Sequence, residues 1–113
     1  MKRVEAIIRH EKLYDLLDEL NKHQFYGVTV TNALGCGIQK GEAKLLRGIE
    51  YNNDYVKKIK IELIIKDHWL DELIDVIIKT LGTGKIGDGK IIVCEIENVY
   101  RVRTGEMGER AID

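Results

Sequence analysis

Residues 5–13 read EAIIRHEKL and residues 62–70 read ELIIKDHWL, so the chain contains one short segment twice. The agreement continues beyond these segments, where Leu13, Leu16, Leu17 and Leu20 correspond to Leu70, Leu73, Ile74 and Ile77. Each copy begins with an apolar strand pattern, passes through a short polar joint and continues with apolar residues at the i, i+3, i+4, i+7 spacing of a helix. The repeat therefore predicts two units, each a β-strand followed by an α-helix.

A second strand pattern follows each predicted helix. It reads YGVTVT at residues 26–31, with alternating β-branched residues, and IIVCEI at residues 91–96. Two βαβ units in one chain predict an α+β fold, the ferredoxin-like double βαβ sandwich, in which an antiparallel sheet carries both helices on one face. Because the helices cover only one face of such a sheet, we expect the other face to be buried by self-association.

The composition predicts one globular domain over residues 1–113, because hydrophobic residues make up 44% and charged residues 33% of the chain. A net charge of −1 and a pI near 6.3 argue against nucleic-acid binding. No apolar run approaches the roughly 20 residues that span a bilayer, and no signal-peptide pattern is seen. Cys36 and Cys94 lack a metal-type spacing. We therefore expect two reduced thiols and a cytoplasmic protein.

The connection between the second helix and the last strand is rich in glycine. It reads TGKIGDGK at residues 83–90, whereas the shorter connection after the first helix, around residues 21–25, has no glycine. Glycines allow consecutive backbone N–H groups to point into one concavity, which binds anions, and a lysine beside it adds a charge for phosphate. The spacing is neither that of a P-loop nor G-x-G-x-x-G. From the residues alone, a phosphate site and a mobile glycine turn are both open.

Two arginines follow the last predicted strand. Arg101 and Arg103 are two positions apart, so on an extended chain their side chains point to the same side. Two guanidinium groups on one side suit bidentate recognition of phosphate oxygens. The alternative is a pair of solvated surface arginines.

The connection between the two repeats, from about residue 35 to about residue 54, is too long for a routine turn and predicts an exposed binding loop. Catalytic groups are hard to assemble, because the chain has no serine and neither cysteine has an adjacent histidine. We interpret His10, His23 and His68 as surface residues without companion metal ligands, and Trp69 as a packing residue.

These segments together resemble the PII family of nitrogen- and carbon-status signalling proteins. The glycine-rich stretch is similar to the family's B-loop (about residues 82–90), and YRVRTGE at residues 100–106 is similar to its C-terminal loop (about residues 99–113). GCGIQKG at residues 35–41 and RGIEY at residues 47–51 are similar to the two ends of its large T-loop (about residues 37–55). The match runs from Met1 to about Glu106, and the B-loop match is specific.

The resemblance implies a compact homotrimer that holds ATP or ADP between subunits, with Arg101 and Arg103 supplied by the neighbouring subunit. The implied nucleotide-binding residues are Thr29, Gly35, Gly37, Ile38, Glu62, Ile64, Gly87, Asp88, Gly89, Lys90, Arg101 and Arg103. The implied 2-oxoglutarate-binding residues are Gln39, Lys40, Gly41, Lys58 and Gly87. Gln39 would also help to hold a Mg²⁺ that bridges the metabolite and the ATP phosphates.

The implied activity is that of a sensor and not of an enzyme. Mg²⁺, ATP and 2-oxoglutarate would bind cooperatively, and the ligand state would reshape the T-loop that partners recognise. The implied partners are an ammonium transporter, nitrogen-assimilation enzymes or nitrogenase-system proteins. Arg47 matches a transporter-contacting position and Tyr51 a nucleotidylated one.

Departures from the family pattern fall mainly in the T-loop, where Ile38 and Leu46 replace a common arginine and tyrosine and residues 42–44 form an uncommon run. Ile49 replaces a serine that some members phosphorylate. These departures affect the choice of partner more than the nucleotide site. A slow ATPase and a sensor of a different small effector are the alternative functions.

Overall fold

The computed structural model describes residues 1–35, 44–46, 49–51 and 56–112. Its strands are β1 (Lys2–Arg9), β2 (Thr29–Gly35), β3 (Lys44–Leu46), β4 (Ile49–Tyr51), β5 (Val56–Ile65) and β6 (Lys90–Glu95). Its helices are α1 (Leu13–Lys22) and α2 (Leu70–Leu81), with short 3₁₀ turns η1 (His10–Lys12), η2 (Asp67–Trp69) and η3 (Gly108–Ala111).

The sequence repeat is a structural repeat. In each copy a strand, β1 or β5, leads through a single 3₁₀ turn into a helix, and the two helices begin at the equivalent residues Leu13 and Leu70. The polar joints of the repeat are these turns, η1 and η2. Equivalent helix positions also face the core, because Leu16 and Leu73 are both fully buried. The periodicity therefore predicted both the elements and their inward faces correctly.

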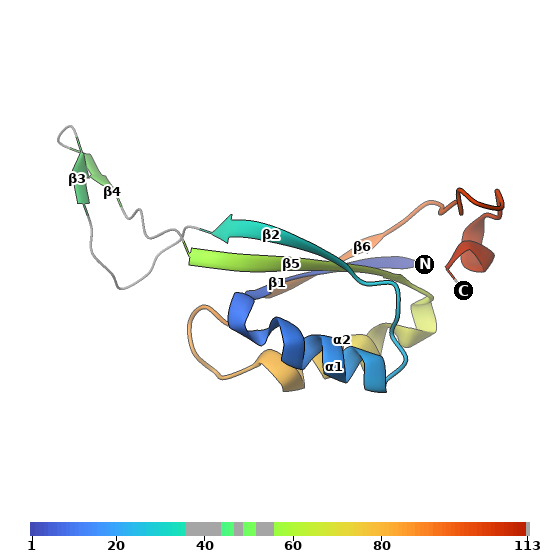
Figure 1. Ribbon diagram of the computed structural model, residues 1–113, viewed down its shortest axis with the longest axis horizontal. Helices are drawn as coiled ribbons and strands as arrows, with labels where there is room; N and C mark the ends of the chain where they lie inside the picture. The colour runs from blue at the N-terminus through green and yellow to red at the C-terminus, as the bar shows by residue number, and fades with distance from the viewer. Residues whose placement is uncertain (36–43, 47–48, 52–55, 113) are drawn as a thin grey trace.

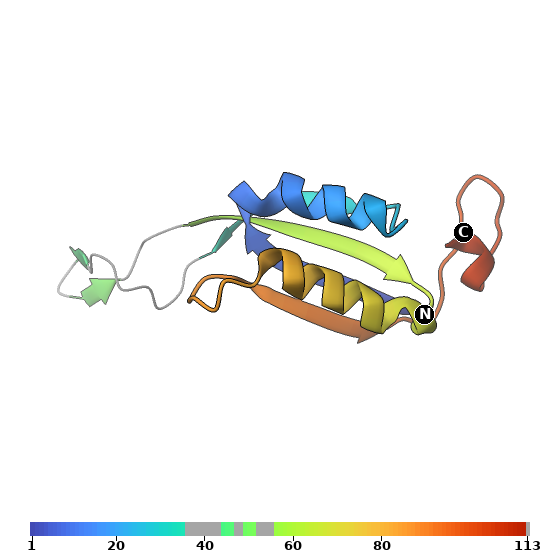
Figure 2. The same cartoon turned by 90° about the horizontal axis from the view of Figure 1, so that it is seen from below.

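The main sheet has the strand order β2-β5-β1-β6, and every neighbouring pair is antiparallel. Both helices lie on one face of this sheet, as the two views in Figure 1 and Figure 2 show. This is the predicted ferredoxin-like arrangement. The core forms between the helices and the alternate residues Val4, Ala6 and Ile8 of β1, with Ile59, Ile61, Leu63 and Ile65 of β5.

Among the described residues, no helix covers the opposite face of the sheet (Figure 1). Glu5 of β1 and Lys60 of β5 lie on it and form an ion pair at 2.6 Å. The hydrogen bond from Lys60 lowers the pKa of the Glu5 carboxyl, and the neighbouring charges act in the same direction. The predicted self-association through this face stays a prediction.

Two predicted connections differ in the structure. β2 begins at Thr29 rather than at residue 26, because Gln24 and Gly27 take left-handed backbone angles, with φ of 63° and 74°, that end the extended pattern. Within the long connection, β3 and β4 pair antiparallel, with Lys44 opposite Tyr51. Strands of three residues are too short for an alternation pattern to reveal.

Candidate functional site

The glycine loop, residues 82–90, joins α2 to β6 and lies at the end of the sheet where β1 ends and β5 begins (Figure 1). Gly84, Gly87 and Gly89 have φ of 77°, 98° and 109°, in the left-handed region where residues with a Cβ are strained. A Cβ on Gly89 would also lie 1.9 Å from the Ile7 carbonyl oxygen. The glycines are therefore needed for this backbone path, which argues for a shaped loop rather than a mobile turn.

Asp88 closes the first half of the loop on itself. Its carboxylate accepts hydrogen bonds from the backbone N–H groups of Thr83 and Gly84, at 2.7 and 3.0 Å, and from the Thr83 hydroxyl at 2.5 Å. The Thr83 hydroxyl is the main reason that the pKa of Asp88 is lowered, followed by the two backbone donors and the charge of Arg9. The side chain of Asp88, a predicted nucleotide-binding residue, therefore points into its own loop. Its backbone N–H is the group that could contact a phosphate.

Two cations from the sheet hold the second half of the loop. Arg9 Nη2 donates to the Ile86 carbonyl oxygen at 2.8 Å, and Lys58 Nζ donates to the Gly87 carbonyl oxygen at 3.0 Å. Arg9 and Lys58 face each other across the β1–β5 pair. In a trans peptide unit the C=O and the following N–H point in opposite directions. The N–H groups of Gly87 and Asp88 therefore point away from the two cations, as consecutive donors in an anion-binding nest do.

The other predicted residues near this end come from three strands. Lys90 begins β6 and pairs with Ile7 of β1. Gly35 ends β2 and lies against the Lys58 side chain, whose Cγ would be 3.1 Å from a Cβ on the glycine. The glycine loop, Lys58, Lys90 and Gly35 thus form one cluster.

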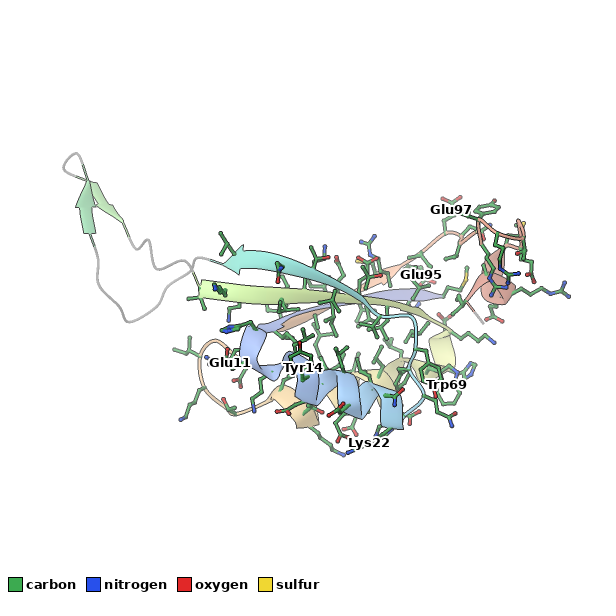
Figure 3. All side chains as sticks on the ribbon, in the orientation of Figure 1. Glu11, Tyr14, Lys22, Trp69, Glu95 and Glu97 are labelled. Carbon is green, nitrogen blue, oxygen red and sulfur yellow. The ribbon has the colours of Figure 1, made fainter. Side chains whose placement is uncertain are left out.

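A second group lies farther along the sheet. Thr29 and Glu62 are opposite each other in the β2–β5 pair, and Ile64 follows on the same face of β5. Glu62 is four residues from Lys58, or about 13 Å along the strand. Ile64 also lines a pocket of about 350 Å³ whose wall includes Gly27, Phe25 and Trp69. Trp69 packs edge-to-face on Phe25, with ring centres 6.4 Å apart, as its interpretation as a packing residue expects. Figure 3 shows it at the end of the helices away from the glycine loop.

The predicted geometry of the arginine pair is wrong. Residues 102–104 form a turn, closed by a 2.8 Å hydrogen bond from Gly105 N to the Arg101 carbonyl oxygen, so no extended chain aligns the two side chains. The Arg101 guanidinium donates to Glu106 at 3.0 Å and to the Arg110 carbonyl oxygen at 3.1 Å. Arg103 lies on the exposed turn. The C-terminal segment is at the opposite end of the sheet from the glycine loop (Figure 1).

The remaining predicted residues include several outside the described part of the chain: Gly37, Ile38, Gln39, Lys40, Gly41 and Arg47. Tyr51 is described only by its backbone pairing in β4. The histidines His10, His23 and His68 are exposed, as predicted. No helix among the described residues has the length and apolar character to cross a bilayer.

Arg9 was missed by sequence reasoning. Its partners in the glycine loop are 77 or more residues away in the chain, and the local sequence pattern does not predict that contact. The available signal was weak: the equivalent position of the second repeat, Lys66, is also basic.

Comparisons with known proteins agree with the predicted family. A family model described as nitrogen regulatory protein P-II matches residues 1–106. The chain is 48% identical over 112 residues to the nitrogen regulatory protein GlnK of Escherichia coli strain K12, and 47% identical over 112 residues to the nitrogen regulatory protein P-II of Pasteurella multocida. Each match covers 99% of this chain and 100% of the relative.

Proposed function

The chain belongs to the nitrogen regulatory protein P-II family, and on that premise we propose that it is a homotrimeric sensor of ATP, ADP and 2-oxoglutarate. It is a regulatory signalling protein and not an enzyme. Through its long connection, with Arg47 and Tyr51, it would regulate a nitrogen-metabolism target such as an ammonium transporter, and it would act in the cytoplasm.

The observation that carries the nucleotide proposal is the backbone shape of the glycine loop. Two sheet cations hold the carbonyl oxygens of Ile86 and Gly87, so the following N–H groups point outward. Outward N–H groups in a glycine nest recognise phosphate oxygens, and Lys90 at the end of the loop adds a positive charge. A preshaped nest binds with less loss of chain entropy than a mobile turn would.

The separation of the two groups supports a site between subunits. The glycine loop and the C-terminal segment that carries Arg101 and Arg103 lie at opposite ends of the sheet within one chain (Figure 1). A nucleotide that contacts both must therefore lie between two copies. The uncovered face of the sheet gives those copies a surface on which to associate, and a closed ring of three would repeat the same contact.

The position of Lys58 supports a link between the nucleotide and 2-oxoglutarate. Its Nζ lies 3.0 Å from the Gly87 carbonyl oxygen, so a carboxylate paired with Lys58 would lie beside the glycine loop. A Mg²⁺ that Gln39 helps to hold would join the two ligands, since Mg²⁺ is commonly shared between few protein ligands and phosphates. ADP lacks the γ-phosphate and would hold this ion less well.

Calorimetry of 2-oxoglutarate binding, first with Mg-ATP and then with Mg-ADP, tests the proposal. We expect tight binding only with ATP, and a trimer by light scattering. Nucleotide binding without any 2-oxoglutarate binding would remove the metabolite from the proposal and favour a different effector. Absence of nucleotide binding would refute the proposed function.

A further inference from the structure

We propose that Arg9 is a positioning residue that holds the glycine loop in its phosphate-binding shape, acting through the loop backbone and not through the ligand. The identity of the ligand depends on the proposed function, whereas the shape of the loop does not.

One side chain contacts three consecutive loop residues. Arg9 Nη2 donates to the Ile86 carbonyl oxygen at 2.8 Å and lies 3.9 Å from an Asp88 carboxylate oxygen. The guanidinium also lies against Gly87, where a Cβ would be 2.8 Å from Nη2 and 3.2 Å from Cζ. Arg9 itself ends β1, which pairs with both β5 and β6. The loop is therefore fastened to the centre of the sheet through this residue.

Arg9 lies on the carbonyl side of the loop backbone, opposite the N–H groups that would contact a phosphate. Its donor faces the Ile86 carbonyl oxygen, and the N–H of Gly87 points the opposite way across the same peptide unit. A phosphate on the N–H side is thus separated from the guanidinium by the loop backbone. The effect of Arg9 on such a ligand is to fix where the donors point.

Lys58 makes a similar contact but has a second proposed role. It holds the Gly87 carbonyl oxygen, yet it is also the cation proposed to pair with 2-oxoglutarate. Its ammonium group has three N–H donors, which a bound carboxylate and the Gly87 carbonyl oxygen would share. No proposed ligand uses Arg9, so Arg9 keeps the loop in place in both ligand states.

Hydrogen–deuterium exchange of residues 83–89, without nucleotide, tests the positioning role directly. Arg9→Met keeps the aliphatic stem and removes every donor, and we expect faster exchange in this segment. Arg9→Lys can still donate one hydrogen bond to the Ile86 carbonyl oxygen and should restore part of the protection. Lys79→Ala removes an equal charge from the exposed face of α2 and should leave exchange of the loop unchanged.

Calorimetry with ATP, ADP and adenosine provides the second readout. Because Arg9→Met loses a hydrogen bond from a charged donor, we expect its affinity for ATP and ADP to fall by a factor of roughly ten or more. Adenosine has no phosphate, and its affinity should not change. Arg9→Gln, which retains a polar but shorter side chain, replaces Arg9→Met if that variant does not assemble.

The outcomes separate the two proposals. If the wild-type protein binds no nucleotide, the proposed function fails, while loop exchange still decides the role of Arg9. Unchanged exchange in both Arg9→Met and Arg9→Gln overturns the inference. Weaker ATP binding with unchanged exchange also overturns it, because Arg9 would then contact the phosphate itself.

Discussion

The Cα of Gly89 lies so close to the Ile7 carbonyl oxygen that a Cβ on this glycine would come within 1.9 Å of it. The contact joins the last glycine of the loop to β1 at the point where β6 begins to pair with that strand. The Ile7 oxygen belongs to the backbone of β1, and a Cβ would be fixed to the backbone of Gly89 next to β6, so relieving the clash would disturb the β1–β6 pairing.

Gly89→Ala should therefore destabilise the protein by at least about 2 kcal/mol, since left-handed strain and a backbone clash act together. Denaturant unfolding at fixed protein concentration measures this cost. Gly84→Ala is the matched control, because Gly84 has φ of 77° but nothing within 4 Å of a Cβ. It should cost only about 1 kcal/mol. Equal losses in the two variants would contradict the close approach.

The contrast between these two glycines also explains what sequence could predict. The repeat predicted β1, α1, β5 and α2, because amphipathic periodicity is a local property that the core then uses. The glycine pattern predicted that the loop was special, but both glycines look alike in sequence. Their difference depends on Ile7, which is far away in the chain. Contacts of this kind, like that of Arg9 with Ile86, arise only from tertiary structure.

The prediction that the side chains of Arg101 and Arg103 share one side was wrong for a related reason. The side-chain direction of Arg101 and Arg103 was inferred from an extended backbone, and residues 102–104 instead form a turn closed by Gly105. The hydrogen bond between Arg101 and Glu106 further fixes one guanidinium and not the other. A short spacing indicates a common side only when the local backbone is already known.

The Thr83–Asp88 contact predicts a pH dependence of stability. The pKa of Asp88 is lowered on folding, so its hydrogen bonds stabilise the protein above the ordinary value of 3.8 and lose this effect as the pH falls through the lowered pKa. Thr83→Val removes the largest cause and should raise the pKa of Asp88. The stability difference from wild type should be larger near pH 6 than near pH 3.

Carboxyl-carbon NMR titration of Asp88 measures the pKa, and thermal unfolding at the two pH values measures the stability difference. Thr80→Val is a suitable control, because the Thr80 hydroxyl donates within α2, to the Val76 carbonyl oxygen at 2.7 Å, and not to a carboxylate. An unchanged Asp88 pKa in Thr83→Val would show that the hydroxyl contact is not the main cause.

Trp69 offers an optical test of where the adenosine part of a nucleotide lies. It is the single tryptophan of the chain, 45% exposed, and lines the same pocket as Ile64 and Gly27. ATP or ADP bound against Ile64 should change its fluorescence intensity or emission maximum. Inorganic tripolyphosphate, which suits the glycine loop alone, should leave the signal unchanged. Calorimetric ATP binding without any fluorescence change would place the base away from this pocket.

Mixed trimers test whether the phosphate site is shared between subunits. Lys90→Ala and Arg103→Ala should each weaken ATP and ADP binding without preventing assembly, since each removes one positive charge proposed to contact the phosphates. In a cyclic trimer that contains both variants, one interface joins the intact Lys90 of one chain to the intact Arg103 of its neighbour. About one third of the sites in such a trimer should then bind with wild-type affinity.

Calorimetry of co-refolded variants, with each variant refolded alone as the control, measures the recovered fraction. If both residues served one site within a single chain, mixing would recover no tight site. Unchanged affinity in both single variants would refute the assignment of Lys90 and Arg103 to the phosphates.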